Sequence, residues 1–159
     1  MKIAAQILEM AVQKSLRLAT AESCTGGMVA AALTDVAGAS RAFDWGVVTY
    51  SNAAKMQLLG LSGVTLDTHG AVSEPVVIEM AQGALVRSGG DLAISVSGVA
   101  GPGGTAAKPE GMVCFGLASA KGARAETVLF GALGRVNVRR AATDHALAML
   151  QGALSASTP

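Results

Sequence analysis

The chain has 159 residues, of which 51% are hydrophobic and 3% aromatic, and its formal net charge at pH 7 is +1. This length and apolar content predict one domain over residues 1–159 with a sizeable core, ending in a frayed tail from about residue 155. Nucleic acid is not an expected partner, because proteins that bind it usually have a basic face and aromatic side chains that stack on bases.

The start of the chain is not typical of a secretory leader or a membrane anchor. Gln6, Glu9 and Lys14 interrupt its apolar residues, and no apolar run approaches the ~18 residues of a membrane span. The two cysteines, Cys24 and Cys114, form no metal-ligand pattern, so we expect free thiols and no metal site. These features predict a cytoplasmic protein without a membrane partner.

Apolar spacing and turn residues predict the elements in chain order. Helices are expected over 2–15, 27–36, 53–59, 74–87 (after an N-cap at Ser73) and 135–153, and strands over 16–22, 43–50, 91–97, 112–120 and 125–131. Residues 60–72 and 98–105 are predicted loops, and the last two strands are predicted to form an antiparallel hairpin. This order predicts the α/β class, as a three-layer α/β/α sandwich around a mixed β-sheet.

The junction between the first strand and the second helix carries candidate nucleophiles. Ser23, Cys24 and Thr25 are followed by Gly26 and Gly27. A side chain at the carboxyl end of a strand would face the first backbone N–H groups of the next helix, which suits attack on a carbonyl group. The same residues are also typical of an ordinary helix N-cap, so the junction alone does not decide between the two interpretations.

A serine nucleophile needs a base, and histidine is scarce, since only His69 and His145 occur. Lys55 stands in the first turn of a predicted helix, where the helix dipole disfavours a cation. To act as a base it needs a pKa about 3 units below its usual ~10.4, which burial can supply. His145 is expected to be structural or solvent-facing. The rival within enzymes is a cysteine hydrolase using Cys24 with His69.

Two further features could bind a phosphate group. Backbone N–H groups of the glycine-rich stretch 98–105 could cradle it, although the stretch matches neither a P-loop nor a dinucleotide-binding fingerprint. Arg135, Arg139 and Arg140 open the last predicted helix, and a guanidinium group can pair with phosphate bidentately. At least one of these arginines is expected to be simply solvated.

Together, these clusters resemble a known family. The stretches 21–27, 48–55, 69–76 and 97–104 are similar, in order and spacing, to motifs of the nicotinamide-nucleotide amidase (NMN deamidase) family. The same domain forms the C-terminal part of the competence/damage-inducible CinA proteins. The resemblance extends from about residue 5 to residue 153.

The resemblance implies hydrolysis of nicotinamide mononucleotide to nicotinic acid mononucleotide and ammonia, in pyridine nucleotide salvage and without a cofactor. It assigns the nucleophile to Ser23 and the base to Lys55, with Tyr50 beside them assisting proton transfer. It assigns oxyanion donors to Thr25, Gly26 and Gly27. The substrate-binding residues that it implies are Ser51, Asn52, Gly101, Gly103, Gly104, Thr105, Arg135 and Arg139.

Two expectations concern the protein's class and partners. A non-catalytic nucleotide- or partner-binding module of the same fold is the alternative to an enzyme. The chain has no counterpart of the N-terminal nucleotide-pyrophosphatase-like domain of full CinA proteins, so that activity is not expected. The apolar content is high for so small a chain, which favours a homo-oligomer.

Overall fold

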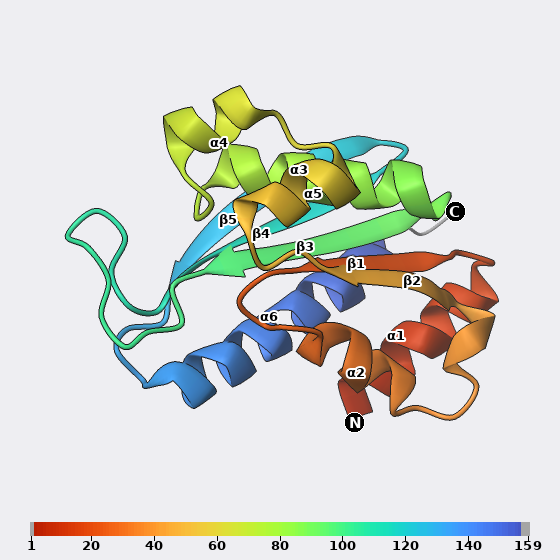
Figure 1. Cartoon of the computed structure of the whole chain (residues 1–159). Coiled ribbons are helices and arrows are strands. Elements are labelled where there is room, and N and C mark those ends of the chain that lie inside the picture. Colours follow the sequence, from red (N-terminus) through yellow and green to blue (C-terminus); the bar gives the residue numbers. More distant parts are fainter. Residues whose placement is uncertain (1, 157–159) are drawn as a thin grey trace.

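In the computed structural model, residues 2–156 are described, and they form a mixed five-stranded sheet between two layers of helices (Figure 1). The strand order is β2-β1-β3-β4-β5. β1, β2 and β3 are parallel, and β4 and β5 extend the sheet as an antiparallel hairpin. The strands span Leu18–Glu22, Phe43–Val48, Leu92–Gly98, Met112–Ser119 and Gly122–Leu129. The predicted three-layer sandwich and hairpin are therefore confirmed.

Each face of the sheet is covered by a different set of helices (Figure 1). α1, α2 and α6 lie on one face, at Lys2–Gln13, Met28–Thr34 and Arg135–Ala156. α3, α4 and α5 lie on the other, at Asn52–Leu59, Gly63–His69 and Glu74–Ser88. A short 3-10 helix, Ala39–Arg41, leads into β2. Within residues 2–156, no helix is both long and apolar enough to cross a membrane.

The prediction that residues 60–72 form a loop was wrong, because this segment contains α4. The hydroxyl of Ser62 accepts a hydrogen bond from the Thr65 N–H at the start of α4. Only Leu66 in this helix is buried, so the segment has no apolar periodicity from which a helix could be read. At the other end of the chain, α6 continues to Ala156, and residues 157–159 of the predicted tail lie outside the described part.

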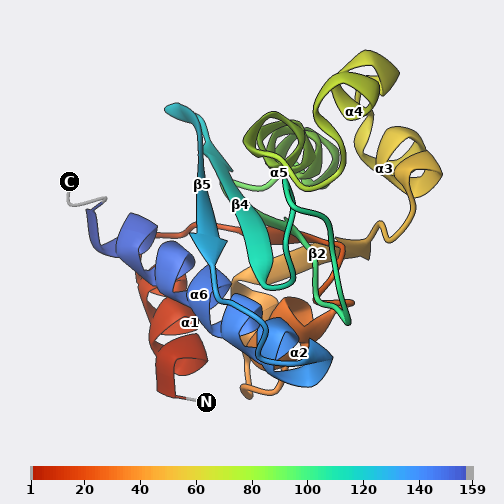
Figure 2. The same ribbon diagram turned by 90° about the vertical axis from the view of Figure 1, so that its left-hand side faces the viewer.

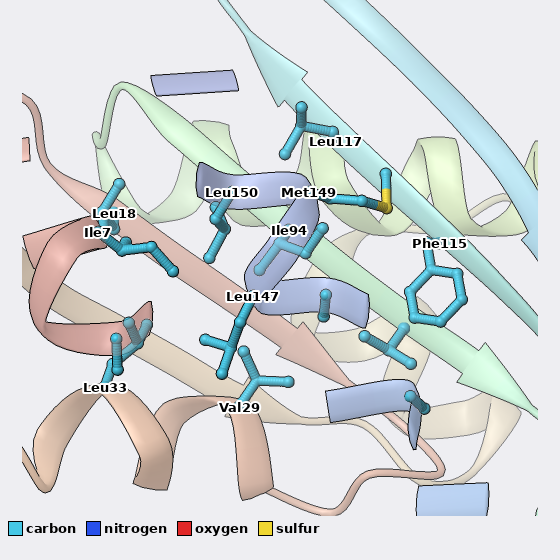
Figure 3. Close-up of a cluster of buried hydrophobic side chains, with 14 of the residues drawn as sticks. Ile7, Leu18, Val29, Leu33, Ile94, Phe115, Leu117, Leu147, Met149 and Leu150 are labelled. Carbon is cyan, nitrogen blue, oxygen red and sulfur yellow. The ribbon is translucent and has the colours of Figure 1, made fainter. Parts of the chain in front are cut away.

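Buried apolar side chains form one cluster on each face of the sheet. Figure 3 shows the cluster beneath α1, α2 and α6, which contains Ile7, Leu33 and Leu150 of the helices and Ile94 and Phe115 of the sheet. Successive residues of a strand point to opposite faces, so Ala93, which precedes Ile94, belongs to the second cluster, beneath α3, α4 and α5. The two clusters fix both helical layers against the strands.

Gly83 of α5 lets the end of α3 come unusually close. A Cβ atom at this position would lie 2.1 Å from the carbonyl oxygen of Leu59, the last residue of α3. Only glycine fits such a contact between a helix and a neighbouring backbone. The position of α3, and with it that of Lys55, therefore depends on this close approach.

The chain leaves two adjacent parallel strands in opposite directions. β1 is followed by α2 on one face, and β2 is followed by α3 on the other, so the two helices stand on opposite sides of the sheet (Figure 2). In open α/β sheets, ligands bind outside the carboxyl ends of strands at such a divergence. Ser23 follows β1 and Lys55 lies in α3, so both belong to this edge.

Candidate active site

Ser23 and Lys55 form a buried hydrogen-bonded pair. The Nζ atom of Lys55 lies 3.0 Å from the Oγ atom of Ser23. Lys55 is 1% exposed and Ser23 is 8% exposed. The two residues paired from the sequence as base and nucleophile are therefore brought within reach of one proton transfer.

Backbone carbonyl groups hold the Lys55 amine on its other side. Nζ donates to the carbonyl oxygen of Thr49 at 2.8 Å and to that of Tyr50 at 3.3 Å. Burial lowers the pKa of Lys55 by penalising its charged form, and this outweighs the opposing effect of the nearby Cys24. A neutral amine that gives its two N–H groups to these carbonyls has its lone pair left for the Ser23 hydroxyl.

The start of α3 explains why Lys55 reaches these atoms. The Ser51 hydroxyl caps α3 by accepting from the Ala54 N–H at 3.0 Å, which puts Lys55 in the first turn. Side chains in a helix tilt toward its N-terminus, so Lys55 extends back toward Thr49 and the end of β2. Asn52 is the first, exposed residue of α3. Ser51, expected at the substrate, thus has a capping role.

Glu22, which sequence reasoning missed, occupies the start of α2. Its buried carboxylate accepts hydrogen bonds from the N–H groups of Gly27, Val29 and Ala30 at 3.2, 2.9 and 3.0 Å. The expectation that the first N–H groups of this helix face the nucleophile does not hold for these three. The available signal was a lone acid that ends an apolar strand just before a helix with no acidic residue in its first turn.

Some backbone N–H groups of the turn after Ser23 already donate hydrogen bonds within the protein. Gly26 donates its N–H to the Ser23 carbonyl at 3.1 Å, and Gly26 and Gly27 have φ values of 60° and 99°, which favour glycine. Two of the three expected oxyanion donors therefore have partners inside the protein. Among residues 2–156, no hydrogen bond uses the N–H of Thr25.

Two arginines of α6 reach the loops around the pair. Arg135 donates to the Tyr50 hydroxyl at 2.6 Å and to the Gly101 carbonyl at 2.8 Å. Tyr50 is 60% exposed, so most of its side chain lies in solvent although its carbonyl contacts Nζ. Arg139 contacts backbone carbonyls of the turn after Ser23 instead of facing open solvent. Arg140, beside it, is exposed.

The glycine loop, residues 98–105, also has backbone N–H groups that donate to neighbouring residues of the protein. The Gly103 N–H donates to the Glu110 carboxylate at 3.1 Å. The Thr105 N–H donates to the Lys108 carbonyl at 3.0 Å, and the Thr105 hydroxyl accepts from the Lys108 N–H at 3.0 Å. Gly104 packs close to the same Lys108 carbonyl. A phosphate at these groups would have to displace the hydrogen bonds of the loop itself.

Comparison with known proteins identifies the family of the chain. Residues 1–154 match the family model of the CinA C-terminal domain. The chain belongs to this family.

Relatives of this CinA-family chain bear two kinds of name. "Nicotinamide-nucleotide amidohydrolase PncC" of Escherichia coli K12 is 48% identical over 94% of the chain and 92% of that protein. A "putative competence-damage inducible protein" of Symbiobacterium thermophilum is 53% identical over 87% of the chain, which spans 35% of that longer protein. A crystal structure of "competence/damage inducible protein CihA" from Agrobacterium tumefaciens is 43% identical, with a TM-score of 0.93 over 97% of this chain and 94% of that one.

Cys24 and His69, the alternative nucleophile and base, do not form a hydrogen-bonded pair like that of Ser23 and Lys55 in the described part of this CinA-family chain. Cys24 is buried, and burial is the main cause that raises the pKa of its thiol to about 11. His69 is an exposed residue at the end of α4, and among residues 2–156 no hydrogen bond joins it to Cys24. His145 packs on Phe115 with ring centroids 4.5 Å apart and contacts Glu126, as expected for a structural histidine.

Residues 2–156 contain no group of three or more His, Cys, Asp or Glu side chains placed to hold an ion.

Proposed function

We propose that this chain hydrolyses the carboxamide of nicotinamide mononucleotide to nicotinic acid mononucleotide and ammonia, as a Ser/Lys hydrolase of pyridine nucleotide salvage. The observation that carries the proposal is the buried Ser23–Lys55 pair, with its 3.0 Å separation of Oγ and Nζ. The E. coli relative named an amidohydrolase of nicotinamide nucleotide, which the chain matches over nearly its whole length, supports the substrate.

In the first step, Ser23 attacks the carboxamide. Neutral Lys55 takes the hydroxyl proton while Oγ bonds to the carboxamide carbon, and the carbonyl electron pair moves onto oxygen. The resulting oxyanion needs N–H donors in the turn after Ser23. The ammonium form of Lys55 then gives its proton to the departing nitrogen, and the C–N bond breaks to release ammonia.

In the second step, water cleaves the ester that joins Ser23 to the nicotinate group. Lys55, neutral again, takes a proton from water as the hydroxide oxygen bonds to the carbonyl carbon. The proton returns to Oγ as the ester bond breaks. The carbonyls of Thr49 and Tyr50 act as the orienting group in both steps, because they occupy the two N–H groups of the amine.

The substrate's own charge supports the same chemistry. The pyridinium ring of the nucleotide is cationic, and a like charge near Lys55 lowers its pKa further. Arg135 is the exposed arginine at the start of α6, and we assign it to the phosphate. Arg135 also donates a hydrogen bond to the carbonyl of Gly101, so its guanidinium group lies beside the glycine-rich stretch 98–105.

The test is ammonia release from nicotinamide mononucleotide by purified protein, beside Ser23→Ala and Lys55→Met. Both variants should lose at least ~10³-fold in kcat, because nucleophile and base act as one unit. Lys121→Met, an exposed lysine in the β4–β5 turn, controls for the loss of a charge and should keep wild-type kcat. A folded wild-type protein that binds the nucleotide without releasing ammonia would instead support the non-catalytic binding module.

A further inference from the structure

Arg139 joins α6 to the turn that carries the nucleophile. Its Nε atom donates to the Cys24 carbonyl at 3.0 Å, and its Nη2 atom donates to the Thr25 carbonyl at 3.1 Å. The side chain is half-buried, and both contacts cross more than a hundred positions of the sequence. A planar guanidinium fork suits two neighbouring carbonyl oxygens in a way that a lysine amine cannot match.

These contacts set the direction of a backbone donor. In a planar trans peptide the C=O and N–H groups point in opposite directions. Because the Cys24 carbonyl faces Arg139, the N–H of Thr25 in the same peptide points away from α6. α6 and α3 lie on opposite faces of the sheet (Figure 1), so this N–H is turned toward the side of α3, which holds Lys55.

The other donors near Ser23 have partners. Gly26 donates to the Ser23 carbonyl, and Gly27 donates to Glu22. Among residues 2–156, no hydrogen bond takes the N–H of Thr25. The peptide between Cys24 and Thr25, whose carbonyl Arg139 holds, therefore carries an unpartnered donor beside Ser23.

We propose that Arg139 is a positioning residue that aims the Thr25 N–H at the oxyanion formed when Ser23 attacks, and that it does not bind the substrate phosphate. The proposal rests on the Ser/Lys amidase function above. A hydrogen bond to the carbonyl also polarises the peptide and strengthens its N–H as a donor. Arg139 thus acts from behind the turn, without touching the substrate.

The test separates kcat from substrate affinity. Arg139→Ala should lower kcat for nicotinamide mononucleotide by about 10²–10³, the usual effect of losing one oxyanion donor. In a Ser23→Ala background, adding Arg139→Ala should leave the Kd for the nucleotide within about threefold, because no phosphate contact is lost. A phosphate ligand would give the reverse pattern, an unchanged kcat at saturation and a Kd raised more than tenfold.

Further variants guard against a simple loss of fold. Arg139→Lys should remain impaired, since an amine cannot bridge both carbonyls, and millimolar guanidinium should restore part of the kcat of Arg139→Ala. Arg140→Ala removes the same charge from the same helix and should match wild type. Full activity of a folded Arg139→Ala would overturn this assignment alone, whereas absence of ammonia release by wild type would overturn the proposed function.

Discussion

Lys55 lies with its amine 3.0 Å from the hydroxyl of Ser23, 32 positions away in the sequence. The two residues meet because β1 and β2 are parallel neighbours and the chain continues from them onto opposite faces of the sheet. The proposed nucleophile is thus fixed by one strand end, and the proposed base by the helix that follows the neighbouring strand. Both groups are buried, so their protonation states depend on the protein more than on water.

The burial of Lys55 predicts how activity depends on pH. Because burial lowers the pKa of Lys55, the neutral base should be present below the ~10.4 of a solvated lysine. The kcat/KM value should rise with pH through this lowered pKa and then level off. A pH series of ammonia release measures the rising limb, and a limb at or above pH ~10.4 would contradict the role of Lys55. Lys55→Arg, protonated throughout, should be inactive at every pH.

The same pKa shift predicts a pH-dependent stability. Between the lowered pKa of folded Lys55 and ~10.4, the unfolded chain binds the additional proton, so the free energy of unfolding rises with pH across this interval. The contribution of Lys55 titration to the free energy of unfolding is lost as pH falls through the folded-state pKa of Lys55. Denaturant unfolding of wild type and Lys55→Met at several pH values isolates it. Parallel curves for the two proteins would show that Lys55 titrates alike in both states.

Cys24 should be chemically inert although it directly follows Ser23. Burial raises its pKa to about 11, so almost no thiolate exists at pH 8. Iodoacetamide should leave Cys24 of the folded protein unmodified at that pH while labelling it in denaturant, as followed by mass spectrometry. Cys24→Ala should keep kcat within about tenfold, because the backbone contacts with Arg139 do not need the thiol. Loss of all activity in this variant would favour the cysteine hydrolase.

The exposed side chain of Tyr50 allows a test of its assignment to proton transfer. Tyr50→Phe keeps the backbone carbonyl beside Lys55 and removes only the hydroxyl that Arg135 holds. We expect KM for nicotinamide mononucleotide to rise severalfold through Arg135, with kcat lowered less than tenfold. Steady-state kinetics distinguish the two parameters. A fall in kcat of ~10² or more would support the family-based expectation that this hydroxyl transfers a proton.

The sequence predicted the parts of this site that depend on local patterns. The strand end before Ser23 and the first helical turn that holds Lys55 marked these two residues as candidates, and the family resemblance paired them as nucleophile and base. The contacts of Arg139 were out of reach, because they link positions 115 residues apart and leave no trace in spacing or periodicity. α4 was missed for another reason, since one buried leucine is too weak a pattern to define a helix.

The three hydrogen bonds of Glu22 predict that it supports both stability and turnover. Glu22→Gln keeps the shape but places an amide donor against at least one backbone N–H of α2, so we expect a loss of about 1–3 kcal/mol in the free energy of unfolding. Because the start of α2 is continuous with the turn after Ser23, kcat should fall as well. Denaturant unfolding and ammonia release on the same samples measure the two effects.

A second glutamate provides the matched control for Glu22. Glu79 accepts hydrogen bonds from the Ser62 N–H and the Thr65 hydroxyl at the start of α4, a helix that carries neither Ser23 nor Lys55. Glu79 is also less buried than Glu22, so Glu79→Gln should destabilise the protein less and leave kcat unchanged. If both glutamine variants lowered kcat equally, the effect would follow from general destabilisation. If Glu22→Gln matched wild type in stability and kcat, the Glu22 carboxylate would not be what holds the turn after Ser23.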